Sequence, residues 1–377
     1  MTTRIPGIAG IAIAIERLMS PIPTFIADPA RRLRALIDAG RAALPLPGRG
    51  QTLQRWSALA AVAAEDLSLV KLFEGHTDAI AILADAGLTD VREPGSLAPA
   101  YGMWAAEPPG ARVVFRPNAD GTVALSGTKA WCSGAAVLDR ALLTVWPEDG
   151  ARVASEAGPW LADVDLHQPG VTVDDSRWKA VGMADSASAS VTFEATPARL
   201  VGHAGFYLSR SGFWQGGIGI AACWHGAACA VGAALHAQAS AVIAGASRAS
   251  VSSVASSGSG ASGADPGWHR ALALGEVDRL LSANAALLRE AADWVDRHPD
   301  RDARAWALRT RAASDECAQQ VLRAVTRAMG AGPLCHDEAL ARLAADLPVF
   351  IRQCHGDRDL VALGHELLKQ AGTTWTL

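Results

Sequence analysis

Apolar residues recur at helical spacing through the first part of the chain. Residues 28–44 carry an apolar stripe, with Asp28 at the N-cap position and Pro29 at the first helical position. Residues 54–87 continue the same spacing and predict one or two further helices. We therefore expect an N-terminal helical domain over residues 1–99.

The pattern changes near residue 100, where short β-prone runs alternate with turn residues. The runs that read as strands are ARVVF, TVALSG, ALLTVW, GPWLADVDL, GVTVDD and ASVTFEA. Asp120 and Gly121 lie between the first two runs and are typical of a β-hairpin. We expect one antiparallel β domain over residues 100–204.

Helical spacing returns from residue 205. Residues 217–246 are rich in alanine and glycine and predict a tightly packed, wholly buried helix. The Ser/Gly-rich segment 247–267 cannot bury enough apolar surface to order itself, so we expect a loop or insert there. Three more helical runs follow, and Pro348 predicts a kink in the last of them. The predicted fold class is α+β, with residues 205–377 forming a C-terminal helical bundle.

Composition narrows the class of protein. The chain has 377 residues, half of them hydrophobic, and a net charge of -4 with both signs mixed along it. This balance argues against a nucleic-acid partner. Six scattered cysteines without a CxxC pair indicate reduced thiols in a cytoplasmic protein. No run reaches the roughly 18 uninterrupted apolar residues of a membrane-spanning helix, and the apolar start of the chain lacks a clear signal-cleavage site.

Two motifs match a nucleotide-binding or metal-binding pattern in part, but the residues around them do not fit such a site. Gly217, Gly219 and Ala222 match the dinucleotide-binding spacing, yet no strand precedes them and no acidic residue follows in the helix. We interpret them as small residues that let helices approach. The Cys–His pairs at 335–336 and 354–355 match no standard zinc spacing, so we expect no metal.

Residues 125–135, LSGTKAWCSGA, hold the most informative pattern. On a regular strand, Lys129, Trp131 and Ser133 would project from one face. An indole offers a flat wall for a planar ring, and a nearby hydroxyl can hydrogen-bond a heteroatom of that ring. An ordinary alternating strand would explain the same spacing, so the residues alone leave both interpretations open.

This stretch resembles the glycine–x–lysine–x–tryptophan strand of acyl-CoA dehydrogenases. Residues 106–108, Ala-Glu-Pro, resemble the family's Thr-Glu-Pro turn, with alanine in place of threonine. Residues 177–202, 310–332 and 352–364 resemble its return strands, its helix before a glycine-rich turn and its C-terminal end. The resemblance spans roughly residues 50–377 in the family's order.

The resemblance implies FAD bound between the β domain and the helical bundle, with a neighbouring subunit completing the site. Trp131 would flank the flavin, Ser133 would hydrogen-bond near its reactive nitrogen, and Ala106 would belong to the same cofactor-binding set. Gly330 and Gly332 of the neighbouring subunit would let backbone N–H groups approach the pyrophosphate. A homodimer or homotetramer, an acyl-CoA or similar substrate and an electron-transfer flavoprotein partner are also implied.

The family's glutamate, which takes the α-proton while the β-hydride passes to the flavin, has no counterpart here. Its usual position falls at residues 353–356 and its alternative position at 215–217, and neither holds a carboxylate. His355 or Asp357 could replace it. Asp357 also fits a solvated helix start.

Three functions therefore stay open. The first is an FAD-dependent oxidoreductase that dehydrogenates an acyl thioester, with His355 or Asp357 as the base. The second is a flavin-dependent monooxygenase, which needs no such base because reduced flavin reacts with oxygen. The third is a non-catalytic partner subunit that kept the fold and lost FAD.

Overall fold

A computed structural model describes residues 28–88, 98–149, 158–252 and 267–370, together with Gly372 and Trp375. For residues 243–252 it describes the backbone but not the side chains. Its first part is helical, with α2 (Pro29–Asp38), α3 (Thr52–Glu65) and α4 (Leu67–Asp85). The N-cap prediction is confirmed, because Asp28 accepts a hydrogen bond from the backbone of Ala30 at 2.9 Å. Asp66 ends α3 and caps α4, which makes two helices of residues 54–87.

The β domain follows as β1 (Tyr101–Trp104), β2 (Val113–Pro117), β3 (Val123–Cys132), β4 (Arg140–Pro147), β5 (Trp160–Asp165), β6 (Val171–Asp174) and β7 (Ala189–Val201). The strand order is β1-β4-β2-β3-β7-β5, and β4 also pairs with β5, which closes the sheet into a barrel. The hairpin at Asp120–Gly121 is confirmed by the antiparallel pairing of β2 with β3.

The prediction of a purely antiparallel domain is wrong. Both β1 and β2 run parallel to β4. The β1 run YGMW is only four residues long and is interrupted by a glycine, and parallel pairing depends on connections that local patterns do not encode.

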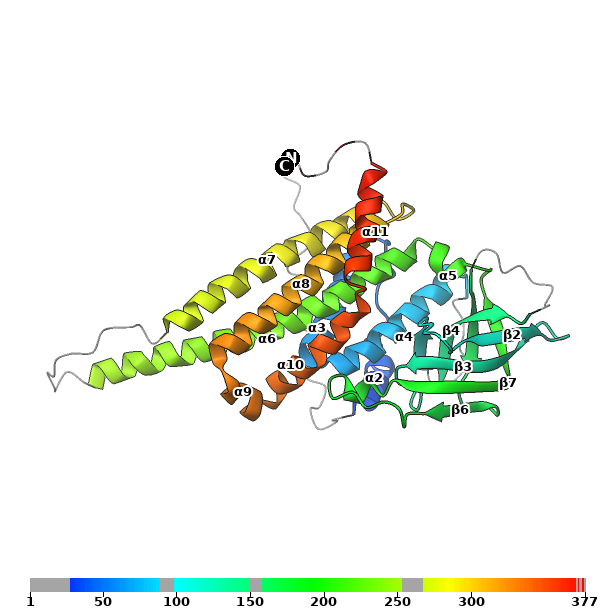
Figure 1. The fold of residues 1–377 in the computed structure, drawn as a ribbon, viewed down its shortest axis with the longest axis horizontal. Helices are drawn as coiled ribbons and strands as arrows, with labels where there is room; N and C mark the ends of the chain where they lie inside the picture. Colours follow the sequence, from blue (N-terminus) through cyan, green and yellow to red (C-terminus); the bar gives the residue numbers. More distant parts are fainter. Residues whose placement is uncertain are drawn as a thin grey trace.

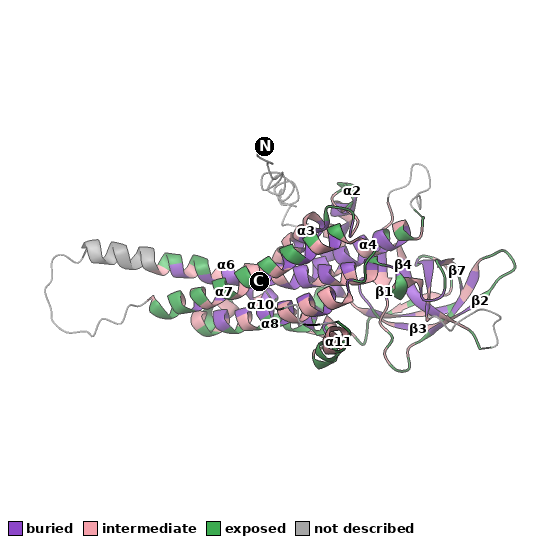
Figure 2. Ribbon diagram, turned by 90° about the horizontal axis from the view of Figure 1, so that it is seen from above, coloured by how far each residue is buried: buried purple, intermediate pink, exposed green. Residues whose placement is uncertain are grey.

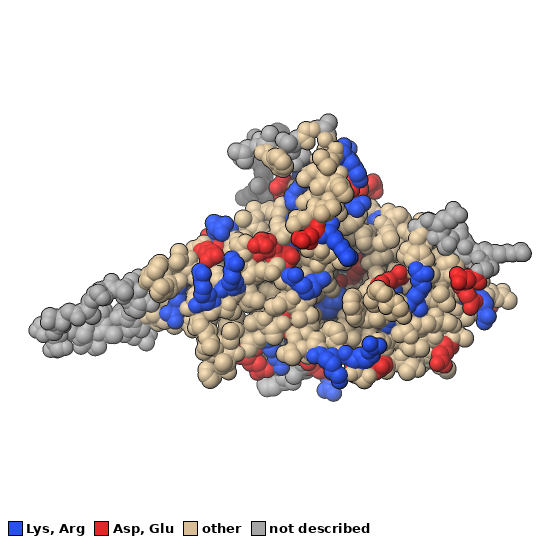
Figure 3. Space-filling model, in the orientation of Figure 1, with Lys and Arg blue, Asp and Glu red and all other residues tan. Residues whose placement is uncertain are grey.

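The C-terminal part contains α5 (Phe206–Ser209), α6 (Gly212–Ser252), α7 (Trp268–Arg297), α8 (Arg304–Met329), α9 (Ala331–His336), α10 (Glu338–Phe350) and α11 (Asp357–Leu368). Helices α6, α7 and α8 run side by side along the long axis, and the β domain lies at one end of the molecule (Figure 1). A 3-10 turn, Ile351–Gln353, follows α10, which ends just after Pro348. On the face drawn in Figure 3, acidic and basic side chains are interspersed.

Helix α6 differs from its prediction in two ways. It continues to Ser252, into the segment predicted to be a loop, while residues 253–266 lie outside the described part of the chain. Ala233 and Ala237 are exposed, so its second half is not wholly buried (Figure 2). Over Gly212–Val242 the helix is long and apolar enough to cross a membrane, but 67% of its most apolar window is buried, as in a core helix.

Small residues allow α6 to pack closely on α3, as predicted from the glycine spacing. A Cβ added to Gly219 would lie 3.1 Å from Leu59 Cδ1, and one added to Gly226 would lie 2.1 Å from the Ala60 carbonyl oxygen. A Cβ on Gly217 would meet nothing within 4 Å. The close contact therefore depends on Gly219 and Gly226.

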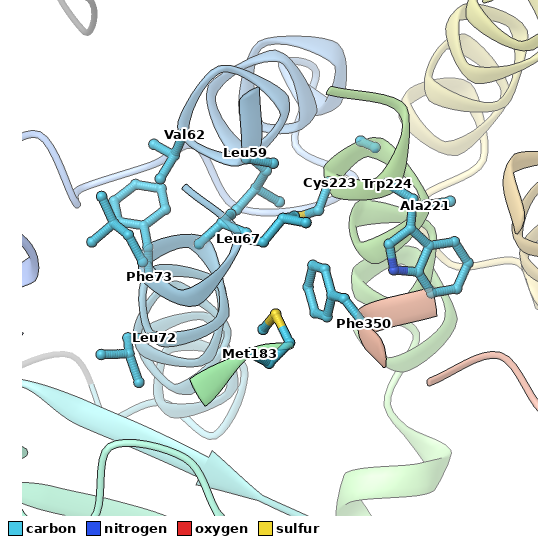
Figure 4. Close-up of a cluster of buried hydrophobic side chains, with 14 of the residues drawn as sticks. Leu59, Val62, Leu67, Leu72, Phe73, Met183, Ala221, Cys223, Trp224 and Phe350 are labelled. Atoms are coloured by element: carbon cyan, nitrogen blue, oxygen red, sulfur yellow. The ribbon is translucent and has the colours of Figure 1, made fainter. Parts of the chain in front are cut away.

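One apolar core joins the helices to the β domain. Leu59, Phe73, Cys223 and Phe350 bring side chains from α3, α4, α6 and α10 together with Met183 of the loop before β7 (Figure 4). The backbone N–H of Met183 also donates to Asp346 on α10 at 2.6 Å. A Cβ on the preceding Gly182 would lie 2.0 Å from the Ala345 carbonyl oxygen. These contacts hold the barrel against the bundle.

The start of α3 is capped by a residue distant in sequence. Asp296 on α7 accepts hydrogen bonds from the backbone N–H groups of Gly50 and Thr52, at 2.9 and 3.0 Å, and from Thr52 Oγ1 at 2.6 Å. The N-cap residue Gln51 makes no such bond with its own side chain. Asp296 therefore joins α7 to the N-terminal helices.

Replacement of Asp296 by alanine is expected to lower the free energy of unfolding by about 2 kcal/mol, because three donors lose their acceptor. Urea unfolding followed by circular dichroism measures the change. Asp293→Ala is the matched control, because Asp293 is exposed on the same helix and pairs only with Arg297 among the described residues. Equal effects of the two substitutions would contradict a capping role for Asp296.

Candidate functional site

A bulge in β3 turns Trp131 out of the barrel. The pairing of β3 with β7 shifts register between Lys129 and Cys132, and Trp131 takes a left-handed backbone conformation with φ +58°. The indole is 63% exposed, whereas Lys129 is completely buried. The prediction that Lys129 and Trp131 share a face is therefore wrong, because the bulge inserts a residue and breaks the alternation. A bulky residue rarely adopts this conformation, and such strain is typical of a functional position.

Lys129 is instead the buried member of a polar network that reaches Glu107 at the surface. Its Nζ donates to Thr144 Oγ1 at 2.6 Å and to the Thr144 carbonyl at 3.1 Å, and lies 3.5 Å from Glu107 Oε1. Glu107 accepts from Thr144 Oγ1 at 2.7 Å and from Trp146 Nε1 at 3.0 Å. Burial lowers the pKa of Lys129. Burial opposes ionisation of Glu107, but hydrogen bonds from Thr144 and Trp146 outweigh it and lower its pKa. The network anchors the Glu-Pro turn to the tryptophan strand.

A pocket of about 510 Å³ opens beside Trp131. It is lined by two indoles, Trp131 and Trp178, by the cation Arg177, and by hydroxyls that include Thr128 and Ser188. Trp178 is held by a hydrogen bond from its Nε1 to the Ala184 carbonyl at 3.1 Å. The pocket thus offers flat apolar walls, hydrogen-bonding groups and one positive charge.

Sequence reasoning missed Trp178 and Arg177. Their signal is the run Arg177-Trp178-Lys179 directly after β6, but its meaning depends on the fold that places it opposite β3. Asp174 is the one carboxylate among the described residues lining the pocket. Hydrogen bonds from the Ser176 side chain and backbone lower the pKa of Asp174. It is therefore a weak candidate for a base.

Ser133 does not line the pocket itself but contacts Ser188, which does. Its Oγ lies 2.8 Å from the Oγ of Ser188, which lines the pocket and lies 3.2 Å from the Oγ of Ser186. Ser186 donates to the Met183 carbonyl at 2.8 Å. The Ser133 carbonyl accepts from Trp104 Nε1 at 3.2 Å. This serine cluster connects the pocket wall to the core shown in Figure 4.

The remaining predicted cofactor residues do not line this pocket. Ala106 is half-buried just before Glu107, and its neighbour Pro108 lines the pocket. Gly330 joins α8 to α9 with φ +71°, and a Cβ on Gly330 or Gly332 would meet nothing within 4 Å. Figure 1 places α9 at the side of the bundle away from the barrel. Within one chain the two glycines are therefore separate from Trp131, and their role toward a second subunit stays a prediction.

His355 and Asp357 lie together between the 3-10 turn and α11, and neither lines the pocket. Both are exposed, and Asp357 is the first residue of α11, where a carboxylate stabilises a helix start. His355 donates its backbone N–H to Asp359 Oδ2 at 3.1 Å. The structure therefore brings the two candidate bases together with each other, and not with Trp131.

Arg311 joins the two positions where the expected glutamate is absent. Its Nη1 donates to the Gly217 carbonyl at 3.0 Å and its Nη2 to the Gln353 carbonyl at 2.7 Å. The guanidinium lies 5.0 Å from the ring centre of Trp224. Burial lowers the pKa of Arg311. No sequence motif marks Arg311, because its role depends on α6, α8 and the 3-10 turn after α10, which meet in space.

Comparison with models of known protein families gives no match, and no curated protein matches the chain by sequence. Comparison of structures does find proteins of similar fold. Butyryl-CoA dehydrogenase from Megasphaera elsdenii superposes with a TM-score of 0.73 at 15% identity, covering 98% of this chain and 100% of that one. FMN-bound TdsC, a dibenzothiophene monooxygenase from Paenibacillus sp. A11-2, gives 0.68 at 18% identity, with 97% and 98% covered. Methanesulfinate monooxygenase MsuC from Pseudomonas fluorescens gives 0.64 at 19% identity, with 97% and 95% covered.

These solved structures include a dehydrogenase and monooxygenases, and they match nearly the whole chain. The order of helices, β domain and helical bundle corresponds to the order expected from the sequence pattern. At these identities the likeness concerns the fold and not the reaction. The chain has the fold of the acyl-CoA dehydrogenases, in a divergent form.

Proposed function

We propose that the chain is a flavin-dependent oxidoreductase whose flavin ring lies against Trp131. The strained, exposed indole supports this proposal, because it gives the 510 Å³ pocket a flat wall that the barrel does not need for its own packing. Thr128 and Ser188 would hydrogen-bond the ring, and Ser133 would hold Ser188 in place. A pocket with aromatic walls and a few convergent polar groups suits a planar heterocycle.

The form of the flavin is part of the proposal. FAD is expected from the family resemblance, whereas the TdsC structure named above contains FMN. Arg177 is the one basic side chain among the described residues lining the pocket, and it would favour a nearby phosphate. Titration of the flavin-free protein with FAD and with FMN distinguishes the two.

Monooxygenation is the reaction that the site supports best. When bound, reduced flavin can supply activated oxygen to a substrate, or oxidised flavin can accept a hydride. Dehydrogenation also needs a base for the α-proton. Both glutamate positions lack a carboxylate, and Arg311 places a guanidinium between them. The absence of a carboxylate at both positions therefore carries the argument.

Dehydrogenation of an acyl thioester is the second candidate, with His355 or Asp357 as the base and an electron-transfer flavoprotein as acceptor. The likeness to butyryl-CoA dehydrogenase supports it. Anaerobic addition of acyl-CoA decides between the two reactions. Bleaching of the flavin would favour dehydrogenation, whereas substrate-dependent oxygen uptake with a flavin reductase would favour monooxygenation. A protein that binds neither FAD nor FMN would instead be the non-catalytic subunit.

Replacement of Trp131 by alanine is expected to weaken flavin binding by at least about tenfold, because the ring loses its stacking surface. Quenching of flavin fluorescence measures the dissociation constant. Trp131→Phe should retain most of the affinity. Trp268→Ala is the matched control, because Trp268 is also a substantially exposed indole but lies on α7. Unchanged affinity in Trp131→Ala would remove Trp131 from the site.

A further inference from the structure

The turn between α10 and α11 holds an aspartate and a histidine in a defined arrangement. Asp359 lies in the first turn of α11, and its side chain is 14% exposed, whereas that of His355 is 68% exposed. One carboxylate oxygen, Oδ2, accepts the backbone N–H of His355 at 3.1 Å. The other, Oδ1, lies 3.4 Å from His355 Nδ1. One carboxylate thus contacts both the backbone and the ring of the same histidine.

The residues just before His355 are held by contacts with the helical bundle. Arg311 donates to the Gln353 carbonyl at 2.7 Å, and the Cys354 side chain is buried in the core with its Sγ 3.5 Å from Asp359 Oδ2. Phe350, four residues before Cys354, packs in the core that contains Met183 (Figure 4). The turn is therefore continuous, through packed side chains, with the serine cluster beside the pocket. Its backbone is held at both ends while the imidazole points outward.

A carboxylate oxygen 3.4 Å from Nδ1 favours one position of the ring proton. An ionised aspartate is an acceptor, so it favours the Nδ1–H tautomer and leaves the lone pair on Nε2. Among the described residues, none makes a hydrogen bond or ion pair with His355 Nε2. That nitrogen is therefore free to accept a proton from a ligand.

We propose that Asp359 is the positioning residue of His355, and that the pair supplies the proton-accepting group at the position where the fold's glutamate is missing. The catalytic role rests on the second candidate of the proposed function, dehydrogenation, because monooxygenation needs no such base, whereas the pair itself does not require a bound flavin. We favour His355 over Asp357 because the Asp357 side chain makes no hydrogen bond or ion pair within the described part of the chain, whereas Asp359 contacts the histidine. A carboxylate that orients an imidazole is a common arrangement for general acid–base work.

Nitrogen-15 NMR of histidine-labelled protein tests the pair directly, with His355→Gln identifying the His355 signals. At a pH where the imidazole is neutral, wild-type His355 is expected in the Nδ1–H tautomer. Asp359→Ala and Asp359→Asn should both lose the Nδ1–H signal in favour of Nε2–H, the form preferred by free imidazole. Asp359→Glu should restore part of it. Asp357→Asn is the matched control and should leave the tautomer unchanged.

The outcomes separate this inference from the proposed function. Wild-type His355 in the Nε2–H form, or an unchanged tautomer in Asp359→Ala, would overturn the positioning role. Circular dichroism of each variant checks that α11 is retained, and Asp359→Asn keeps the side-chain volume where alanine disturbs the turn. Flavin affinity is measured on the same samples. Loss of all flavin binding in wild type would reject the proposed function, while the tautomer would still report on the pair.

Discussion

Replacement of Gly226 by alanine is expected to lower the free energy of unfolding by about 3 kcal/mol or more, or to prevent folding. The added Cβ would lie 2.1 Å from the Ala60 carbonyl oxygen and 2.7 Å from the Ala60 Cα. Both are backbone atoms of α3 and cannot rotate away, so α3 and α6 would have to separate. Neighbouring Trp224 and Ala227 are completely buried, and separation would open voids around them.

Urea unfolding measures this effect, and expression level reports on a variant that fails to fold. The matched control is Gly275→Ala on α7, which is exposed and where a Cβ would meet nothing within 4 Å. Because alanine favours helix more than glycine does, this control is expected to gain about 0.5–1 kcal/mol. A small loss in Gly226→Ala would show that the two helices are not in close contact.

Stability is expected to fall as the pH drops from 6.5 to about 4, because two buried histidines must then take up protons on unfolding. Burial, with a smaller contribution from Arg34, lowers the pKa of His76 to about 4 from an ordinary 6.5. Burial likewise lowers the pKa of His225 to about 4, with a smaller contribution from Arg289. His76 Nδ1 accepts the backbone N–H of Tyr101 at 3.1 Å, so protonation at that nitrogen would break the bond.

The sign follows from proton binding. Between pH 6.5 and 4 the unfolded state binds more protons than the folded state, so the free energy of unfolding decreases as the pH falls. Each histidine contributes about 3 kcal/mol to the free energy of unfolding, and this contribution is fully present above pH 6.5. Burial raises the pKa of Glu74 and Asp163, which gives contributions of the opposite sign. The histidine effect is therefore measured as a difference between wild type and variant.

Urea unfolding at several pH values supplies that difference. His76→Asn keeps an acceptor and removes the titration, so its stability should depend less steeply on pH than that of wild type. His167→Asn is the control, because the His167 side chain is 66% exposed. Parallel curves for wild type and His76→Asn would show that His76 does not carry the acid sensitivity.

The elements of the fold were largely predictable because their signals are local. Asp28 and Pro29 mark the start of α2, and Asp120 with Gly121 marks a hairpin, since caps and turns depend on a few adjacent residues. The Glu-Pro turn and Trp131 could be found for the same reason, as parts of a short motif. The β1 strand could not, because its four residues, YGMW, form a short run that contains a glycine and are ordered by pairing with β4.

The candidate site was predictable only in part. Trp131 was recognised, but the direction of its side chain depends on a bulge opposite β7, which no property of residues 125–135 specifies. Trp178 joins the pocket only because β6 lies beside β7. Arg311 donates hydrogen bonds to the carbonyls of Gly217 and Gln353, which are distant from it in sequence.

The sequence by itself determined the helices, most strands, the order of helices, β domain and helical bundle, and the absence of a glutamate at both expected positions. Local propensity and residue identity are sufficient for those conclusions. Only the tertiary structure decided that Lys129 is buried while Trp131 is exposed, that Asp296 caps α3, and that the two empty glutamate positions meet at one guanidinium. These depend on contacts between segments far apart in the chain, whose energies arise only when packing brings the segments together.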